Sequence, residues 1–128
     1  MPAFMSTGPG SPCALVVDDE QLIRSTLCRA LASIGFRVQG AGSLSDAVAA
    51  LDHPIDLAVI DVHLGDGSGL EFARLLRIVS PRARIVMISA DTFDFQNTSG
   101  LDIVAWLRKP FDLDELLAHA SSLRAASH

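Results

Sequence analysis

The chain lacks the features that mark several large classes of protein. Its ten Lys and Arg residues are outnumbered by fifteen Asp and Glu residues, so the net charge is -5 and no basic excess is available to neutralise nucleic-acid phosphates. No apolar run approaches the ~18 residues that a membrane-spanning helix needs. Residues 1–12 have neither the basic start nor the apolar stretch of a secretory signal. We therefore expect a soluble, cytoplasmic domain that binds neither nucleic acid nor membrane.

Cysteine and lysine are scarce as well. Cys13 and Cys28 are too few and too far apart for a metal framework, and each falls within an apolar pattern, which favours two buried, reduced thiols. The positive charge consists of nine Arg residues and a single Lys, Lys109, which Pro110 follows directly. This one ammonium group is therefore a candidate functional residue.

The length of 128 residues predicts one domain, and a hydrophobic content of 49% is sufficient for its core. Gly, Pro and Ser dominate residues 1–12, which we interpret as a flexible leader. Residues 13–125 form the predicted domain, and residues 126–128 form a short tail.

Within the domain, turn signals separate five apolar runs that alternate with helical patterns. Continuous apolar character is typical of strands covered on both faces, and we expect strands at residues 13–17, 36–39, 55–60, 83–88 and 103–107. Helices are expected at residues 22–34, 44–51, 70–79 and 113–123, with Ser43 and Asp112 as N-caps and Gly35 as a C-cap. Residues 91–100 are rich in poor helix formers and predict a short or frayed helix. This alternation predicts the α/β class, a doubly wound parallel sheet with helices on both faces.

Polar residues end four of the five predicted strands. Asp18 and Asp19 follow the first strand, Asp61 the third, Ser89 the fourth and Lys109 the fifth. The carboxyl ends of parallel strands share one edge, where the ligands of open α/β sheets bind. Three carboxylates placed there repel one another unless a divalent cation or a lysine compensates their charge. Carboxylates, Mg²⁺, lysine and serine around one point describe a site for transferring a phosphoryl group, with an aspartyl phosphate as the covalent intermediate.

These residues lie in four runs whose order and spacing are highly specific. They are LVVDDE at residues 15–20, DLAVID at residues 56–61 followed by Gly69, ISA at residues 88–90 and LRKPF at residues 107–111. Through these runs the chain resembles the response-regulator receiver domain of bacterial two-component signalling over residues 13–125. The resemblance implies a flavodoxin-like fold with five parallel strands in the order 2-1-3-4-5.

The resemblance also implies a role in the metal and phosphoryl site for each matching residue. Asp61 would accept the phosphoryl group. Mg²⁺, with Mn²⁺ as a substitute, would be held by Asp19, by Asp61, by the backbone carbonyl of His63 and, through water, by Asp18. The side chains of His63 and Asp91 flank the entrance and would tune hydrolysis. A solvent-facing loop histidine or a ring that ligates the metal are the other interpretations of His63.

Phosphorylation would then act as a switch. Ser89 and Lys109 would bind the phosphoryl oxygens, and the peptide bond between Lys109 and Pro110 would be cis. Trp106 would be the aromatic residue that turns inward, or else a static core residue. The gap of 20 residues between Ser89 and Lys109 looks short for the family, so the fourth helix is expected to be atypical.

The implied function is phosphorelay signal transduction. A sensor histidine kinase or a phosphotransfer protein would donate the phosphoryl group to Asp61. The surface of the fourth helix, fifth strand and fifth helix would then change its affinity for an unknown output partner or for a second copy, so the chain would be a monomer or a phosphorylation-dependent dimer. We expect no turnover of an external substrate.

Other interpretations remain open at this stage. Asp19 or Glu20 could serve only as the N-cap of the following helix. A receiver-like interaction module that works without phosphorylation would keep the same fold. A phosphohydrolase with an aspartyl nucleophile is disfavoured, because His63 stands where such enzymes commonly have a second acid.

Overall fold

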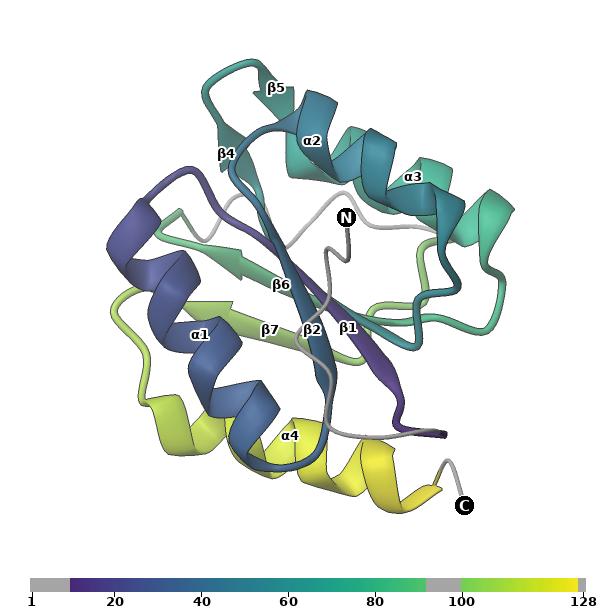
Figure 1. Cartoon of the computed structure of the whole chain (residues 1–128). Helices are drawn as coiled ribbons and strands as arrows, with labels where there is room; N and C mark the ends of the chain where they lie inside the picture. Colours follow the sequence, from purple (N-terminus) through teal and green to yellow (C-terminus); the bar gives the residue numbers. More distant parts are fainter. Residues whose placement is uncertain (1–9, 92–99, 127–128) are drawn as a thin grey trace.

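The computed structural model describes residues 10–91 and 100–126 of the chain (Figure 1). Most of the expected leader, the core of the expected short helix at 91–100 and the end of the expected tail therefore lie outside the described residues.

Five parallel strands form the central sheet. They are β1 (Cys13–Val17), β2 (Arg37–Ala41), β3 (Leu57–Asp61), β6 (Arg84–Ser89) and β7 (Ala105–Arg108), in the spatial order β2-β1-β3-β6-β7. This order confirms the predicted arrangement 2-1-3-4-5. The first strand has the predicted bounds, and the others begin and end slightly later in the chain than their apolar runs. A strand begins only where a neighbouring strand pairs with it. Ile55 is buried but precedes the first paired residue, Leu57, so the apolar run starts before the strand does.

Helices cover both faces of the sheet (Figure 1). They are α1 (Gln21–Ser33), α2 (Leu44–Ala49) with the 3-10 turn η1 (Ala50–Asp52), α3 (Gly69–Val79) and α4 (Leu113–Ala126). One core lies between the sheet and α1 with α4, where Leu27, Leu31 and Leu116 are buried. The other lies between the sheet and α2 with α3, where Phe72 and Leu76 are buried.

The predicted helix signals act as expected where the structure describes them. The hydroxyl of Ser43 accepts a hydrogen bond from the backbone N–H of Asp46 at 3.0 Å and caps α2. Gly35 follows α1 with φ +105°, a conformation that residues with a Cβ rarely adopt. The last helix begins directly after Asp112.

A short hairpin occupies the glycine-rich segment between the third strand and α3. Strands β4 (His63–Leu64) and β5 (Gly67–Ser68) pair antiparallel. The carboxylate of Asp66 at its tip accepts the backbone N–H groups of Leu44 and Ser45, at 2.7 and 3.1 Å. The hairpin after the third strand is thereby attached to the start of α2.

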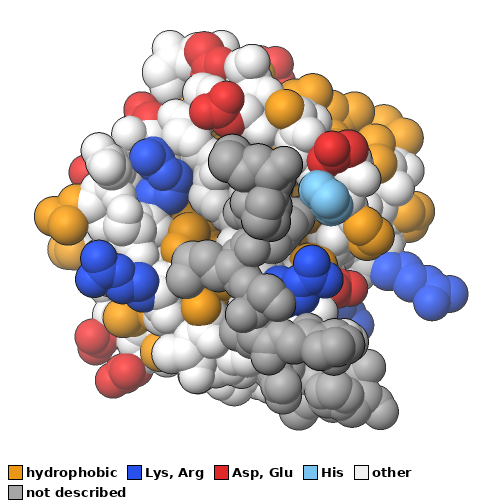
Figure 2. All heavy atoms as spheres, viewed as in Figure 1, with side chains coloured by type: hydrophobic (Ala, Val, Ile, Leu, Met, Phe, Trp, Pro, Cys, Tyr) orange, Lys and Arg blue, Asp and Glu red, His pale blue; other side chains and the backbone are white. Residues whose placement is uncertain are grey.

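The surface carries a few exposed apolar side chains. Figure 2 shows hydrophobic side chains at its upper right, on the side of α2 and α3, where Val48, Leu75, Ile78 and Val79 are exposed. Among the described residues, no helix is both long and apolar enough to cross a membrane.

Candidate phosphorylation site

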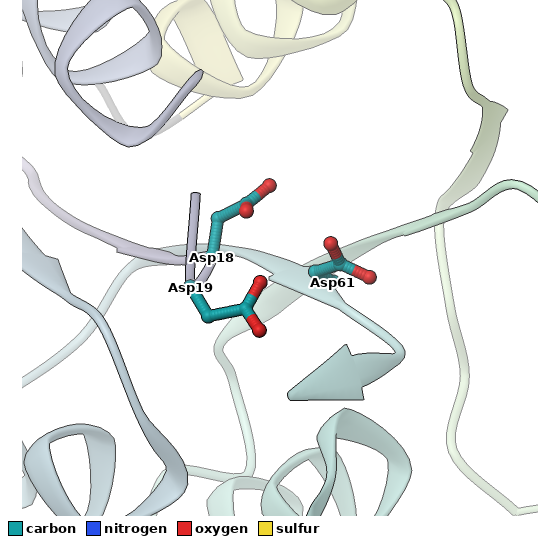
Figure 3. A group of neighbouring side chains, drawn as sticks. All are labelled: Asp18, Asp19 and Asp61. Atoms are coloured by element: carbon teal, nitrogen blue, oxygen red, sulfur yellow. The ribbon is translucent and has the colours of Figure 1, made fainter. Parts of the chain in front are cut away.

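Three aspartates from two neighbouring strands lie at the carboxyl edge of the sheet. Asp18 and Asp19 follow β1, and Asp61 ends β3, which pairs with β1. One carboxylate oxygen from each lies within 4.8 Å of the other two. Asp18 and Asp61 are buried and Asp19 is exposed, and Figure 3 shows all three carboxylates facing a common space. The structure therefore brings together the three acids that the sequence pattern placed at one edge.

The single lysine provides the counter-charge to this cluster. The Nζ atom of Lys109 lies 2.7 Å from Asp61 Oδ2, 3.2 Å from Asp18 Oδ2 and 3.1 Å from Glu20 Oε1. Burial acts to lower the pKa of Lys109, but its hydrogen bonds to Asp61 and Glu20 and the charges of Asp61 and Asp18 outweigh burial and raise that pKa. Lys109 therefore stays charged beside the carboxylates at any physiological pH.

Glu20 is a member of this ion-pair group that the sequence pattern did not reveal. It stands at the N-cap position of α1 but makes no side-chain capping bond, and its carboxylate contacts the ammonium of Lys109 instead. The two residues are 89 positions apart in the chain, so only the fold brings them together. The only sequence signal was the third consecutive acid after Asp18 and Asp19.

Asp18 is held on several sides. Its backbone N–H donates to the carbonyl of Ala41 at 3.1 Å, and its Oδ1 accepts the backbone N–H of Glu20 at 2.9 Å. Burial raises the pKa of Asp18; the Glu20 N–H and the charge of Lys109 act against this, and the charge of Asp61 adds to it. Its second oxygen, Oδ2, is buried and lies 3.2 Å from Lys109 Nζ, a cation that Asp18 shares with Asp61 and Glu20. Buried carboxylates that share one cation are a suitable place for a further positive charge.

Gly69 allows the chain to pass directly against Asp61. A Cβ atom at this position would lie 2.8 Å from Ile60 Cγ2 and 2.9 Å from the carbonyl carbon of Asp61, and closer still to that carbonyl oxygen. The Gly69 N–H donates to the carbonyl of Val62 at 2.7 Å. The glycine that follows Asp61 by eight residues is therefore required for close approach of two backbone segments.

Comparison with known proteins decides the family. The family model of the response regulator receiver domain matches residues 14–121. The chain belongs to this family. It is thus a receiver domain of the response regulators that act in two-component signalling.

Over the aligned residues, curated relatives are about a third identical to this receiver domain. The acid tolerance regulatory protein ActR of Sinorhizobium medicae is 35% identical over 107 residues, which cover 81% of this chain and 55% of the relative. The response regulator MprA of Mycobacterium sp. (strain KMS) is 37% identical over 115 residues, which cover 85% of this chain and 49% of the relative. The chain spans about half the length of these relatives.

Solved structures show the same fold. A CheY-like receiver domain from Methanospirillum hungatei superposes with a TM-score of 0.84 at 20% identity, covering 92% of this chain and 97% of the other. TrrA of Thermotoga maritima, solved with Mg²⁺ and BeF, gives 0.78 at 28% identity over 88% of this chain and 98% of the other. A Burkholderia pseudomallei response regulator with a phosphorylated aspartate, calcium and citrate superposes with a TM-score of 0.76 at 27% identity. The match covers 90% of this chain and 72% of the other.

Other predicted site residues lie at or just beyond the carboxyl ends of neighbouring strands in this receiver domain. Ser89 ends β6, and its buried hydroxyl accepts the N–H of Asp91 at 3.0 Å and donates to the Asp91 carbonyl at 3.2 Å. The Asp91 side chain is exposed. The Lys109–Pro110 peptide bond is cis, which confirms that prediction.

Two residues with open roles have definite positions in the receiver domain. The backbone N–H of His63 donates to Asp61 Oδ1 at 3.0 Å, and its side chain is exposed in the hairpin. Trp106 lies on β7 opposite Met87, partly buried against the core that α2 and α3 cover. Its position allows both the switching and the static interpretation.

Asp66 makes a long-range contact that the sequence pattern did not predict. Hydrogen bonds from the backbone N–H groups of Leu44 and Ser45 lower the pKa of its exposed carboxyl. It ties the hairpin that begins with His63, two residues after Asp61, to a helix that is distant in sequence. The glycines at 65 and 67 marked a turn there, but they carried no signal for this contact.

Proposed function

We propose that Asp61 accepts a phosphoryl group from a phosphohistidine on a sensor histidine kinase or a phosphotransfer protein, in a reaction that depends on a divalent cation. The observation that carries this proposal is the position of Asp61: its carboxylate is buried, lies 2.7 Å from Lys109 Nζ and faces the carboxylates of Asp18 and Asp19. We take residues 13–125 as the domain that performs this reaction.

The transfer is a displacement at phosphorus. A carboxylate oxygen of Asp61 forms the new O–P bond and the N–P bond of the phosphohistidine breaks. The imidazole, already protonated on its other ring nitrogen, takes the electron pair of that bond and leaves as a neutral ring. Lys109 is charged and already lies beside the Asp61 carboxylate. It can therefore bind and stabilise the negatively charged phosphoryl oxygens once the group is on Asp61. No proton has to move from the protein for this step.

The residues present fit a hard cation such as Mg²⁺. The cluster offers only oxygen ligands, and its buried carboxylates, Asp18 and Asp61, share the charge of Lys109 with Glu20. Asp19, Asp61 and the carbonyl of His63 would hold the ion directly, with Asp18 acting through water. Mn²⁺ accepts the same kind of ligands and would substitute. When bound, the cation would neutralise carboxylate and phosphoryl charge and so lower the electrostatic barrier to transfer.

A donor protein needs a surface on which to deliver its phosphohistidine. An apolar groove of about 540 Å³ opens beside Lys109 between the start of α1 and residues 110–113. Leu22 on its rim is 80% exposed, and Phe111 lies on the opposite side. Exposed apolar surface next to a reaction site is typical of a protein-binding surface, and we assign this groove to the donor.

The phosphoryl group on Asp61 is then the signal. It adds charge and acceptor oxygens at the edge that Ser89 and Lys109 also line. Ser89 would exchange its bonds to the Asp91 backbone for one to a phosphoryl oxygen, and Trp106 on the neighbouring strand β7 would repack. The surface that the family resemblance implies, built from the fourth helix, fifth strand and fifth helix, would change its affinity for an output partner or a second copy. His63 and Asp91, both exposed near the entrance, would tune the rate at which water removes the group.

The test is phosphorylation by acetyl phosphate, with beryllofluoride as a non-reactive substitute, each with and without Mg²⁺. Intact mass reports the adduct and Trp106 fluorescence reports repacking. We expect a Mg²⁺-dependent adduct in the wild type and in Asp56→Asn, and none in Asp61→Asn. Asp56 is the matched control because it lies just before the same strand, at the opposite edge of the sheet.

A folded wild type that forms no adduct and does not respond to beryllofluoride would contradict this function. The remaining interpretation would then be an interaction module that works without phosphorylation.

A further inference from the structure

Arg24 reaches from α1 back to the acid cluster, and nothing in the phosphorylation chemistry described above assigns it a role. It lies one helical turn after Glu20, and its backbone N–H donates to the Glu20 carbonyl at 2.9 Å. Its guanidinium turns back toward the preceding loop, where Nη1 donates to the backbone carbonyl of Asp18 at 2.8 Å. This contact is partly buried, so water competes with it less than on an open surface.

Two glycines at the end of β2 make room for the Arg24 side chain. A Cβ atom on Gly40 would lie 3.2 Å from both Cγ and Cδ of Arg24. A Cβ atom on Gly42 would lie 2.8 Å from Nη1 and 3.3 Å from Cζ. Neither glycine has a positive φ, so any residue fits their backbone conformation. What the two positions provide is therefore space, which lets the arginine lie along the backbone.

Asp18, the first of the two adjacent acids, is consequently held by hydrogen bonds at both of its backbone groups. The N–H of Asp18 is bound by the carbonyl of Ala41, which lies between the two glycines, and the C=O of Asp18 is bound by Arg24. A peptide unit is planar, so fixing this C=O also fixes the N and Cα atoms of Asp19. The Asp19 side chain is exposed, so its direction depends on that backbone more than on packing.

We propose that Arg24 is a positioning residue for the divalent cation: through the Asp18 carbonyl it holds the peptide that aims the Asp18 and Asp19 carboxylates at a common point. The inference rests on the proposed function, because that function supplies the cation. Three carboxylates repel one another when they lie close together. A backbone that already holds two of them in place therefore reduces the rearrangement that cation binding requires.

The first test is a Mg²⁺ titration by isothermal calorimetry on the full chain. We expect Arg24→Ala to raise the Kd for Mg²⁺ by about tenfold, the lower end of the effect of residues that orient metal ligands. Arg24→Lys keeps one donor on a flexible stem and should restore part of the affinity. Arg29→Ala is the matched control, because Arg29 is an exposed arginine on the same helix, and it should leave the Kd unchanged.

A double-mutant cycle tests whether Gly42 affects Mg²⁺ binding through the position of the Arg24 side chain. Gly42→Ala adds a methyl group where Nη1 now lies, so it should raise the Kd while Arg24 is still present. The same substitution in the Arg24→Ala background should add nothing, because the side chain that it displaces is gone. Additive effects would show that Gly42 acts independently of Arg24 and would overturn the inference.

A second measurement needs no metal. Amide hydrogen exchange at Glu20, whose N–H is bound to Asp18 Oδ1, should be faster in Arg24→Ala and Gly42→Ala than in wild type and Arg29→Ala, all in EDTA. Urea unfolding of each variant reports global stability separately. A loss of stability with an unchanged Kd would make Arg24 merely structural and would overturn the inference. If Arg24→Ala does not fold, Gly42→Ala and Arg24→Lys decide.

Mg²⁺ binding by the wild type separates a missing metal site from a missing role of Arg24. A folded wild type that binds no Mg²⁺ removes the proposed metal site and this inference with it. A wild type that binds Mg²⁺, together with an Arg24→Ala variant of the same affinity and the same Glu20 exchange rate, removes this inference alone.

Discussion

Replacing Gly69 by alanine tests whether close backbone approach, rather than loop flexibility, explains the glycine beneath Asp61. The added Cβ would lie 2.9 Å from the Asp61 carbonyl carbon and nearer to its oxygen, whereas ordinary van der Waals contact begins at 3.4 Å. The two backbone segments must therefore separate by more than 0.5 Å. The obstacle is main chain in a buried strand, so no flexible side chain can move aside. We expect a loss of about 3 kcal/mol in the free energy of unfolding, the upper end of the range for overpacking.

Urea unfolding with linear extrapolation measures this loss, and Gly65→Ala is its control. A Cβ on Gly65, in the hairpin that precedes Gly69, would lie 3.9 Å from Asp19 Oδ2. This is an ordinary contact, so the substitution should cost no more than about 0.5 kcal/mol. The m-value should not change, because the folded and unfolded states expose the same surface as before. Gly69→Ala should also reduce adduct formation with acetyl phosphate, since Asp61 itself must shift. Equal stability of the two variants would refute the close-approach argument.

Three further predictions concern charge, the groove and a thiol. Burial raises the pKa of Asp18, so its share of stability is fully present below the ordinary carboxyl pKa and is lost as pH rises through the raised value. Asp18→Asn should thus have a higher free energy of unfolding than wild type in EDTA at neutral pH. When Mg²⁺ is added to near 100 Kd, the free energy of unfolding of the wild type should rise by about 2.7 kcal/mol and that of the variant by less. A variant less stable than wild type in EDTA would contradict this. Leu22→Ser should slow transfer from a phosphohistidine protein while leaving acetyl phosphate labelling unchanged; equal slowing of both would exclude a docking role. Burial raises the pKa of Cys28 from 9.0 to about 11 against the charge of Arg24, so below pH 9 the folded chain should carry about 100-fold less thiolate there than the unfolded chain. Iodoacetamide labelling read by mass would reveal this, and a native rate that levels off near pH 9 would disprove it.

Local patterns were sufficient for the outline of the fold. Continuous apolar runs predicted parallel strands because both faces of the sheet are covered, and β1 has the predicted bounds. Ser43 and Gly35 marked helix ends because capping depends on residues only a few positions apart. The hairpin β4–β5 was missed because two pairs of residues are too short for a periodic pattern.

Some residues of the site were predictable from the sequence and others were not. Asp18, Asp19, Asp61 and Lys109 were predicted because each follows a strand, and parallel strands place their carboxyl ends at one edge. Glu20 was missed because its partner is distant in the chain. Glycines two residues apart after the second strand were the one available signal for Arg24, but glycines after a strand more often mean a turn.

The sequence by itself determined the chemistry of the protein: which charges exist, that only one is an ammonium group, and at which edge of the sheet they gather. These follow from residue identity and from the short-range periodicity of strands and helices. Only the tertiary structure decided how Lys109 is shared among Asp61, Asp18 and Glu20, and how Arg24 lies over Gly40 and Gly42. The physical reason is that electrostatic and packing energies change over a few tenths of an ångström, and the sum of all packing in both cores sets such distances.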